Sequence, residues 1–187
     1  MAVNWWDKLF IRKPPENKRQ PCFIQFEVAN VEALERLTTI VAAFQADKSE
    51  GNGRSAEEWA SAFLPNELNT FWHPDDRERQ AWDTYWFSTP LPERHRPEMP
   101  TPPWHFGSML EAVIENGDYD LIGIRTLQNG EGRLEYNPHG DTYGGTGALR
   151  ALVRAFGHRV IGMDDGTGYE TGDPQAPRWT PGMQVQT

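Results

Sequence analysis

The stretch at residues 137–157, NPHGDTYGGTGALRALVRAFG, places a glycine-rich turn directly before an amphipathic helical pattern. Backbone N–H groups at a helix N-terminus favour an anion, and glycines let a ligand approach the chain closely. The candidate anion-binding residues are Gly144, Gly145, Thr146 and Gly147. However, neither the P-loop nor the G-x-G-x-x-G spacing is present, and no lysine follows Lys48. The favoured reading is structural: the glycines form the turn, and Thr146 or Thr142 caps the helix.

His139 and Asp141 form an H-x-D pair within the same stretch. In an extended segment both side chains point to the same side, which suits a metal ion or an acid–base pair. Two ligands do not make a site, so a third polar group would have to come from elsewhere. The available groups are Asp164, Asp165, His73, His95 and His105. Because a surface contact between the two side chains is the commoner outcome, we predict no metal site and no cofactor.

Two further motifs give weaker chemical signals. The Asp164-Asp165-Gly166 sequence lacks the alternating oxygen ligands and terminal glutamate of a calcium loop, and it indicates a turn. Cys22 begins a predicted strand without a local partner, and no G-x-S-x-G motif occurs. Catalysis is therefore not favoured, although a small-anion- or metal-dependent enzyme centred on the glycine-rich loop stays an alternative.

The elements that would position these residues follow a ferredoxin-like order. Strand patterns occur at residues 22–29, 119–127, 133–138 and 158–165, and helical patterns occur at residues 30–49 and 147–157. The sequence βα followed by ββαβ is the split βαβ arrangement. We expect an α+β class, with an antiparallel sheet, helices on one face, and a helical, proline- and tryptophan-rich insertion at about 49–118.

The chain divides into three expected parts. Residues 1–21 form a basic segment with a short helix, residues 22–170 form a single α+β domain, and residues 171–187 form an irregular tail. Strand alternation places Ile122 and Ile161 toward the helices and Leu121 on the opposite, open face of the sheet.

Tryptophans of the insertion are the candidate interaction surface. Some of them are expected to cover the open sheet face, and any that stay exposed would mark an interface. These residues are Trp72, Trp82, Trp86 and Trp104.

Charge and composition narrow the partners. The chain has 27 acidic and 18 basic residues and a formal net charge of -9, which argues against a nucleic acid. Only residues 1–21 are locally basic, and their short apolar stripe suggests weak surface anchoring. The single cysteine, Cys22, rules out an internal disulfide and indicates a cytoplasmic location. No apolar run approaches the roughly 20 residues that a membrane-spanning helix needs.

The sequence therefore favours an acidic, non-catalytic interaction module that binds a protein partner. A more specific alternative is an immunity- or antitoxin-like inhibitor, whose acidic surface would attract a basic partner. The pattern specifies neither the identity of the partner nor the oligomeric state.

Overall fold

The computed structural model describes residues 20–51, 53–94, 96, 98–117, 119–139, 145–173 and 176–183. Within these residues the strands form one antiparallel sheet in the order β2-β3-β1-β4-β5. The strands are β1 (Cys22–Glu27), β2 (Tyr119–Thr126), β3 (Glu131–Pro138), β4 (Arg159–Asp164) and β5 (Tyr169–Thr171). With helices against the sheet, the protein belongs to the α+β class, as predicted. The basic segment at 1–21 falls almost wholly outside the described residues.

One helix follows β1, another follows β3, and further helices occupy the insertion. The helices are α1 (Val31–Glu50), α2 (Ala56–Ala60), α3 (Pro65–Leu68), α4 (Asp76–Ser88), α5 (Phe106–Leu110), which continues into the π-helical η2 (Glu111–Glu115), and α6 (Gly145–Ala155). Local signals set their ends: the Asn30 side chain accepts the Ala33 N–H at 2.8 Å, and Gly51 ends α1 with a φ of 66°. None of the helices in the described part is long and apolar enough to cross a membrane.

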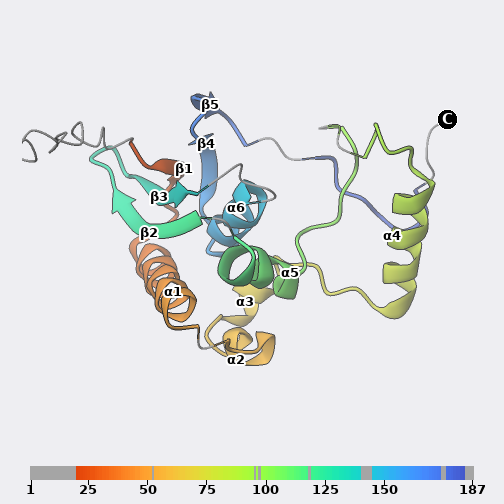
Figure 1. Cartoon of the computed structure of the whole chain (residues 1–187), viewed down its shortest axis with the longest axis horizontal. Helices are drawn as coiled ribbons and strands as arrows, with labels where there is room; N and C mark the ends of the chain where they lie inside the picture. Colours follow the sequence, from red (N-terminus) through yellow and green to blue (C-terminus); the bar gives the residue numbers. More distant parts are fainter. Residues whose placement is uncertain are drawn as a thin grey trace, which may run out of the picture.

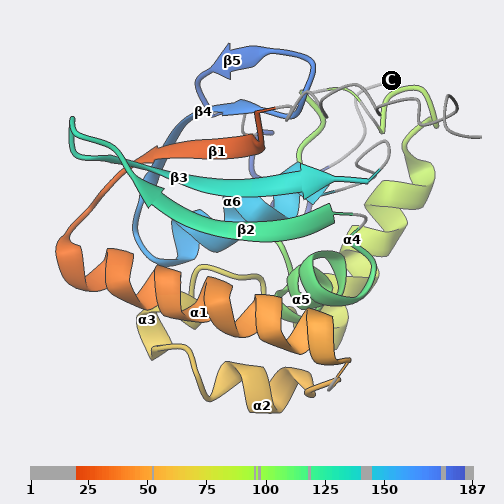
Figure 2. The ribbon, with the colours of Figure 1, turned by 60° about the vertical axis from the view of Figure 1, so that its left-hand side comes forward.

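The main core lies between one face of the sheet and the helices (Figure 2). Ile24, Phe26, Leu134 and Tyr136 alternate along β1 and β3 and are fully buried on this face. Residues of the insertion complete the core from below α1, including Trp59, whose ring meets Phe44 edge to face at 4.6 Å. The insertion therefore packs on the helical side.

The opposite face of the sheet is polar and ion-paired. Arg133 on β3 donates to the Gln25 Oε1 atom of β1 at 2.9 Å, and its guanidinium lies 3.8 Å from the Phe23 ring centroid. Arg125 pairs with Glu135 at 3.3 Å on the same face. Since Trp72, Trp82, Trp86 and Trp104 line a cavity against α6 on the helical side, the expectation that tryptophans cover the open face is wrong.

Two register shifts change which residues of the edge strands face inward. The ladder between β2 and β3 shifts between Leu121 and Gly123, so that Leu121 is 7% exposed and Ile122 is 42% exposed. A second shift opposite Gln25 and Phe26 buries Val160 in place of Ile161. The predicted inward positions of Ile122 and Ile161 were wrong because simple alternation assumes an uninterrupted ladder.

Helix α4 stands apart from the sheet and is joined to it by extended segments (Figure 1). The C-terminal segment pairs with the extended segment that follows α4: the Trp179 N–H donates to the Thr101 carbonyl at 3.0 Å. Trp179 is 4% exposed and contacts Trp72, Trp82 and Tyr85 at ring-centroid distances of 6.2, 5.4 and 6.4 Å. A small aromatic cluster around Trp179 thus holds α4 in place, separately from the main core.

Candidate binding cleft between α4 and α6

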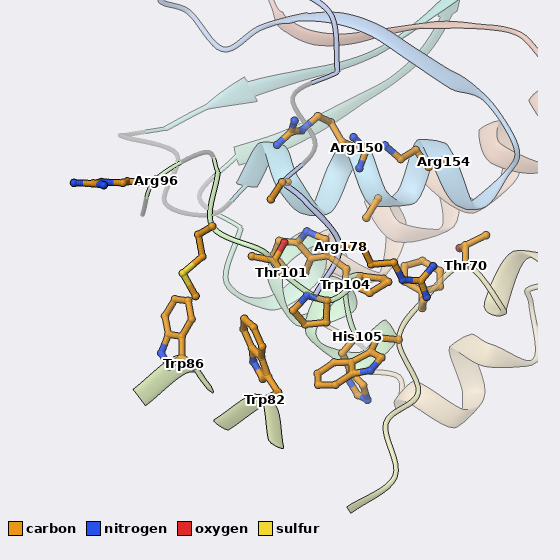
Figure 3. A pocket seen from close by; sticks show the side chains of 18 residues that line it. Thr70, Trp82, Trp86, Arg96, Thr101, Trp104, His105, Arg150, Arg154 and Arg178 are labelled. Atoms are coloured by element: carbon orange, nitrogen blue, oxygen red, sulfur yellow. The ribbon is translucent and has the colours of Figure 1, made fainter. Parts of the chain in front are cut away.

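A cleft of about 980 Å³ lies between α4 and α6 (Figure 3). Its third side is the extended segment 99–105, which carries Pro102, Pro103 and Trp104. This volume is at the upper end of the range for small-molecule sites, about 300–1,000 Å³. Two kinds of side chain dominate its lining in the described residues: tryptophans (Trp72, Trp82, Trp86 and Trp104) and arginines (Arg96, Arg150, Arg154 and Arg178). We call it the arginine–tryptophan cleft.

The tryptophans are half-buried, so each keeps part of its ring accessible from the cleft. Trp82 and Trp86 follow one another by one helical turn on α4, with ring centroids 5.7 Å apart. Trp82 also packs edge to face on the buried Trp179, with ring centroids 5.4 Å apart, and this contact fixes the orientation of the Trp82 ring. The Trp72 N–H donates to the Trp104 carbonyl at 2.9 Å, and this bond ties two walls of the cleft together. The predicted tryptophan set therefore converges on one cavity.

The arginines on α6 are spaced one turn apart and share a counter-ion. Nε of Arg154 donates to Oδ2 of Asp173 at 2.7 Å, and Arg150 lies 3.6 Å from Oδ1 of the same carboxylate. Burial lowers the pKa of Arg150, and the charge of Arg154 lowers it further, whereas Asp173 raises it. One carboxylate thus faces two guanidinium groups, of which Arg150 is partly desolvated.

The remaining two arginines come from distant parts of the chain. Arg96 and Arg178 are exposed residues on the rim, and Figure 3 shows Arg178 beside Trp104. No aspartate, glutamate, cysteine or lysine is among the described residues that line the cleft. The cleft is therefore locally cationic within a chain whose formal net charge is -9.

His105 is the one titratable group on the described cleft wall besides the arginines. Partial burial lowers the pKa of His105, and the positive charge of Arg79 and proximity to His73 lower it further. At neutral pH the ring is therefore uncharged and offers one donor and one acceptor nitrogen.

Only His139 of the H-x-D pair lies in the described structure. The ladder between β2 and β3 brings the end of β3 beside Asp120, and Nε2 of His139 lies 2.9 Å from its Oδ2. Both side chains are more than half exposed. Asp141 lies outside the described residues, and no group of three or more histidine, cysteine, aspartate or glutamate side chains in the described part could hold a metal ion. His139 thus has a surface partner that the sequence did not indicate.

The described part of the glycine-rich stretch, from Gly145 onward, contributes to packing next to the cleft. Gly144 lies outside the described residues, and Gly145 begins α6. The Thr146 carbonyl accepts the Arg150 Nε–H at 3.4 Å. A Cβ atom on Gly147 would lie 3.1 Å from Cζ2 of Trp104, so glycine allows this tryptophan to approach the helix closely. The structure therefore gives Gly147 a place on the cleft wall, against a ring that the sequence did not connect with it.

The remaining sequence candidates lie in a turn and in the core. Asp164 and Asp165 accept the N–H groups of Gly166 and Thr167 at 2.9 and 3.0 Å, and the Thr167 hydrogen bonds lower the pKa of Asp165. Cys22 is buried, and burial raises the pKa of its thiol, which keeps it protonated and unreactive.

Comparison with known proteins provides no functional assignment: no family model, curated protein or solved structure matches the chain. The candidate site therefore depends on the residues and geometry alone.

Sequence reasoning missed the arginines of the cleft. Arg150 and Arg154 have i, i+4 spacing on the less apolar side of a predicted helix, a pattern that indicates one shared face but also fits ordinary solvation. Arg96 and Arg178 are separated by 82 positions, and each lies in a proline-containing segment without periodicity. Their convergence depends on the pairing of Thr101 with Arg178, for which the sequence gives no signal.

Proposed function

We propose that this protein is a non-catalytic binding module that holds an anionic ligand in the arginine–tryptophan cleft. The observation that carries the proposal is that Arg150, Arg154 and Arg178 line one cavity of about 980 Å³, with Arg96 at its outer edge (Figure 3). The sequence favoured a binding module with a protein partner. The lining of the cleft supports a binding role and favours an anionic ligand over a basic one.

The charge distribution supports this choice. Arginine presents a rigid fork of N–H donors that pairs with carboxylate or phosphate in a bidentate manner. Concave, low-dielectric walls of one sign concentrate counter-ions, even when the net charge of the whole protein has the opposite sign. Asp173 offsets part of the charge on α6, while Arg178 comes from the C-terminal segment and Arg96 lies at the outer edge of the cleft (Figure 3). The proposed ligand would add negative charge to a cleft that four arginines line.

The lining chemistry supports binding rather than catalysis. Among the described cleft residues, only His105 could transfer a proton near neutral pH, and no carboxylate or thiol lies beside it on the wall. Nucleophilic and general acid–base mechanisms need such a pair within hydrogen-bonding reach. The alternative, an inhibitor of a basic partner, depends on the acidic composition of the chain alone. The cleft does not support it, because arginines rather than acidic residues line the cleft.

The arrangement of the elements within the α+β class is a second inference. We infer a ferredoxin-like arrangement, supported by the strand order β2-β3-β1-β4 with antiparallel neighbours and by α1 and α6 following β1 and β3. In this arrangement β5 and the α4 segment are additions to the split βαβ unit.

A cytoplasmic location is inferred from the single buried cysteine.

Anion binding can be tested directly with pyrophosphate, a small ligand that carries no ring. We expect tryptophan fluorescence to change saturably when pyrophosphate replaces chloride at constant ionic strength, because Trp82 and Trp104 line the same cavity as the arginines. Arg178→Gln should weaken this binding about tenfold or more, because it removes a charge-assisted contact. The matched control is Arg159→Gln, which removes an exposed arginine paired with Glu27 on the sheet. Equal binding by both variants, or no saturable change at all, would contradict the proposal.

A further inference from the structure

The cleft is divided between two kinds of wall. In Figure 3, Arg150 and Arg154 extend from α6 on one side, and Trp82 and Trp86 extend from α4 on the facing side. Trp104 and Arg178 lie between them. The cationic groups and the aromatic rings are thus offered to a ligand from different directions within one cavity. A ligand that fills the cleft would contact both walls at once.

A simple inorganic anion leaves the aromatic wall unused. Phosphate or sulfate can satisfy arginines, but it is far smaller than a cavity of about 980 Å³ and has no apolar surface for Trp82 or Trp86. Tryptophan faces and guanidinium planes both favour flat π systems over other apolar groups. The Trp82 ring already stacks on Tyr85 at 5.9 Å and is also braced by Trp86 and Trp179, so a ligand ring would add to an aromatic stack that is ordered beforehand.

The charge of the whole chain excludes a polymer of such units. A nucleic-acid strand would continue beyond the cleft over a surface whose formal charge sums to -9 for the chain, and its further phosphates would be repelled. A single unit places its one anionic group at the arginines and exposes no other phosphate. The charge of the chain therefore favours a single nucleotide-like unit over a nucleic-acid strand as the ligand.

We propose that the ligand is a mononucleotide-like molecule, with a planar ring that stacks on the α4 tryptophans and a phosphate that pairs with the arginines of α6 and the cleft rim. This inference rests on the proposed function and names the ligand class of the same site. Stacking contributes to affinity with little dependence on the base, so purine and pyrimidine nucleotides should bind within a few-fold of one another. The arginines recognise the phosphate group.

Three probes separate the contributions of the ring and the phosphate: AMP, ribose 5-phosphate and adenosine, titrated calorimetrically into the full chain. We expect AMP to bind at least about tenfold more tightly than either of the other two, because only AMP contacts both walls. Equal affinities for AMP and ribose 5-phosphate would overturn the ring inference and leave anion binding intact. If neither phosphate compound binds, or if adenosine binds as well as AMP, the proposed function fails as well.

Substitutions at the two walls give an independent check. Trp82→Leu should weaken AMP about tenfold and leave ribose 5-phosphate unchanged, whereas Trp82→Phe should restore most of the AMP affinity because it keeps an aromatic face. Arg178→Gln should weaken both phosphate compounds by the same factor. If Trp82→Leu weakens AMP and ribose 5-phosphate equally, the change is structural and the stacking inference is wrong; Trp82→Phe that binds AMP no better than Trp82→Leu has the same meaning.

Discussion

Replacement of Trp179 by alanine is expected to free α4 while leaving the sheet folded. Trp179 is 4% exposed, and its ring contacts Trp72 and Trp82, which line the cleft, and Tyr85 of α4. It does not belong to the main core cluster of the described residues, which joins the sheet to α1 and α6. The substitution should therefore weaken the contacts that hold α4 to the rest of the protein.

The size of the effect follows from this burial. Truncation of a buried tryptophan or phenylalanine to alanine costs about 3–5 kcal/mol. Since each 1.4 kcal/mol is a factor of ten, local opening of α4 should become about 10² to 4 × 10³ times more frequent. Most of the α4 amides should then lose their protection, because the free energy of local opening is only part of the global stability.

Hydrogen exchange read by mass spectrometry measures this effect segment by segment. In Trp179→Ala, residues 76–88 should exchange rapidly while β1 and β3 keep their protection. The matched control is Trp59→Ala, a residue that is 2% exposed within the main core, and this change should reduce protection in the sheet and α1 together. The reasoning would be refuted if Trp179→Ala reduced protection in β1 and β3 by the same factor as in α4.

Two further predictions concern the main fold. His158 is buried against the Phe26 ring, at 4.9 Å between centroids, and burial lowers the pKa of His158 below 6.5. Its contribution to stability is complete above pH 6.5 and is lost as the pH falls toward the folded pKa, because the unfolded chain takes up the proton first. Urea midpoints measured between pH 7.5 and pH 5 should fall less steeply in His158→Leu than in the parent chain, and parallel curves would contradict this assignment. Glu67 is 3% exposed and accepts from Arg36 at 2.7 Å with both oxygens, so Glu67→Gln should lower the free energy of unfolding by about 2 kcal/mol. Arg159→Gln breaks an exposed pair with Glu27 and should cost less than about 1 kcal/mol, and a cost equal to that of Glu67→Gln would show that burial does not distinguish the two pairs.

Local signals in the sequence predicted much of the sheet and the helix ends. The alternation of Ile24 and Phe26 with other residues indicates a half-buried strand. Asn-Gly is a dipeptide typical of hairpin turns, and Asn129-Gly130 lies between β2 and β3, where Gly130 has a φ of 81°. The Ser55 and Glu58 pair indicated the start of α2, where both reciprocal capping bonds form. These features depend on neighbours within a few positions, which sequence patterns describe well.

The cleft depends on contacts between distant segments, and these were not predictable from the same patterns. Trp82 and Trp104 were selected as an interaction surface from composition, but their positions on the cleft follow from the pairing of Thr101 with Arg178 and from the burial of Trp179 in a tail expected to be irregular. The inward positions of Leu121 and Val160 depend on register shifts that no residue type marks clearly. The sequence therefore indicated the tryptophans of the candidate site but not its arginines.

The most direct test of the cleft is to follow the tryptophan indole N–H signals by NMR while AMP is added to the ¹⁵N-labelled full chain. If the cleft binds this ligand, signals of Trp72, Trp82, Trp86 and Trp104 should shift saturably, and the signal of Trp59 in the main core should not move. The Arg150 and Arg178 Nε–H signals should shift over the same range of AMP concentration. Unchanged cleft signals, or changes confined to arginines of the open sheet face such as Arg125 and Arg133, would contradict the account.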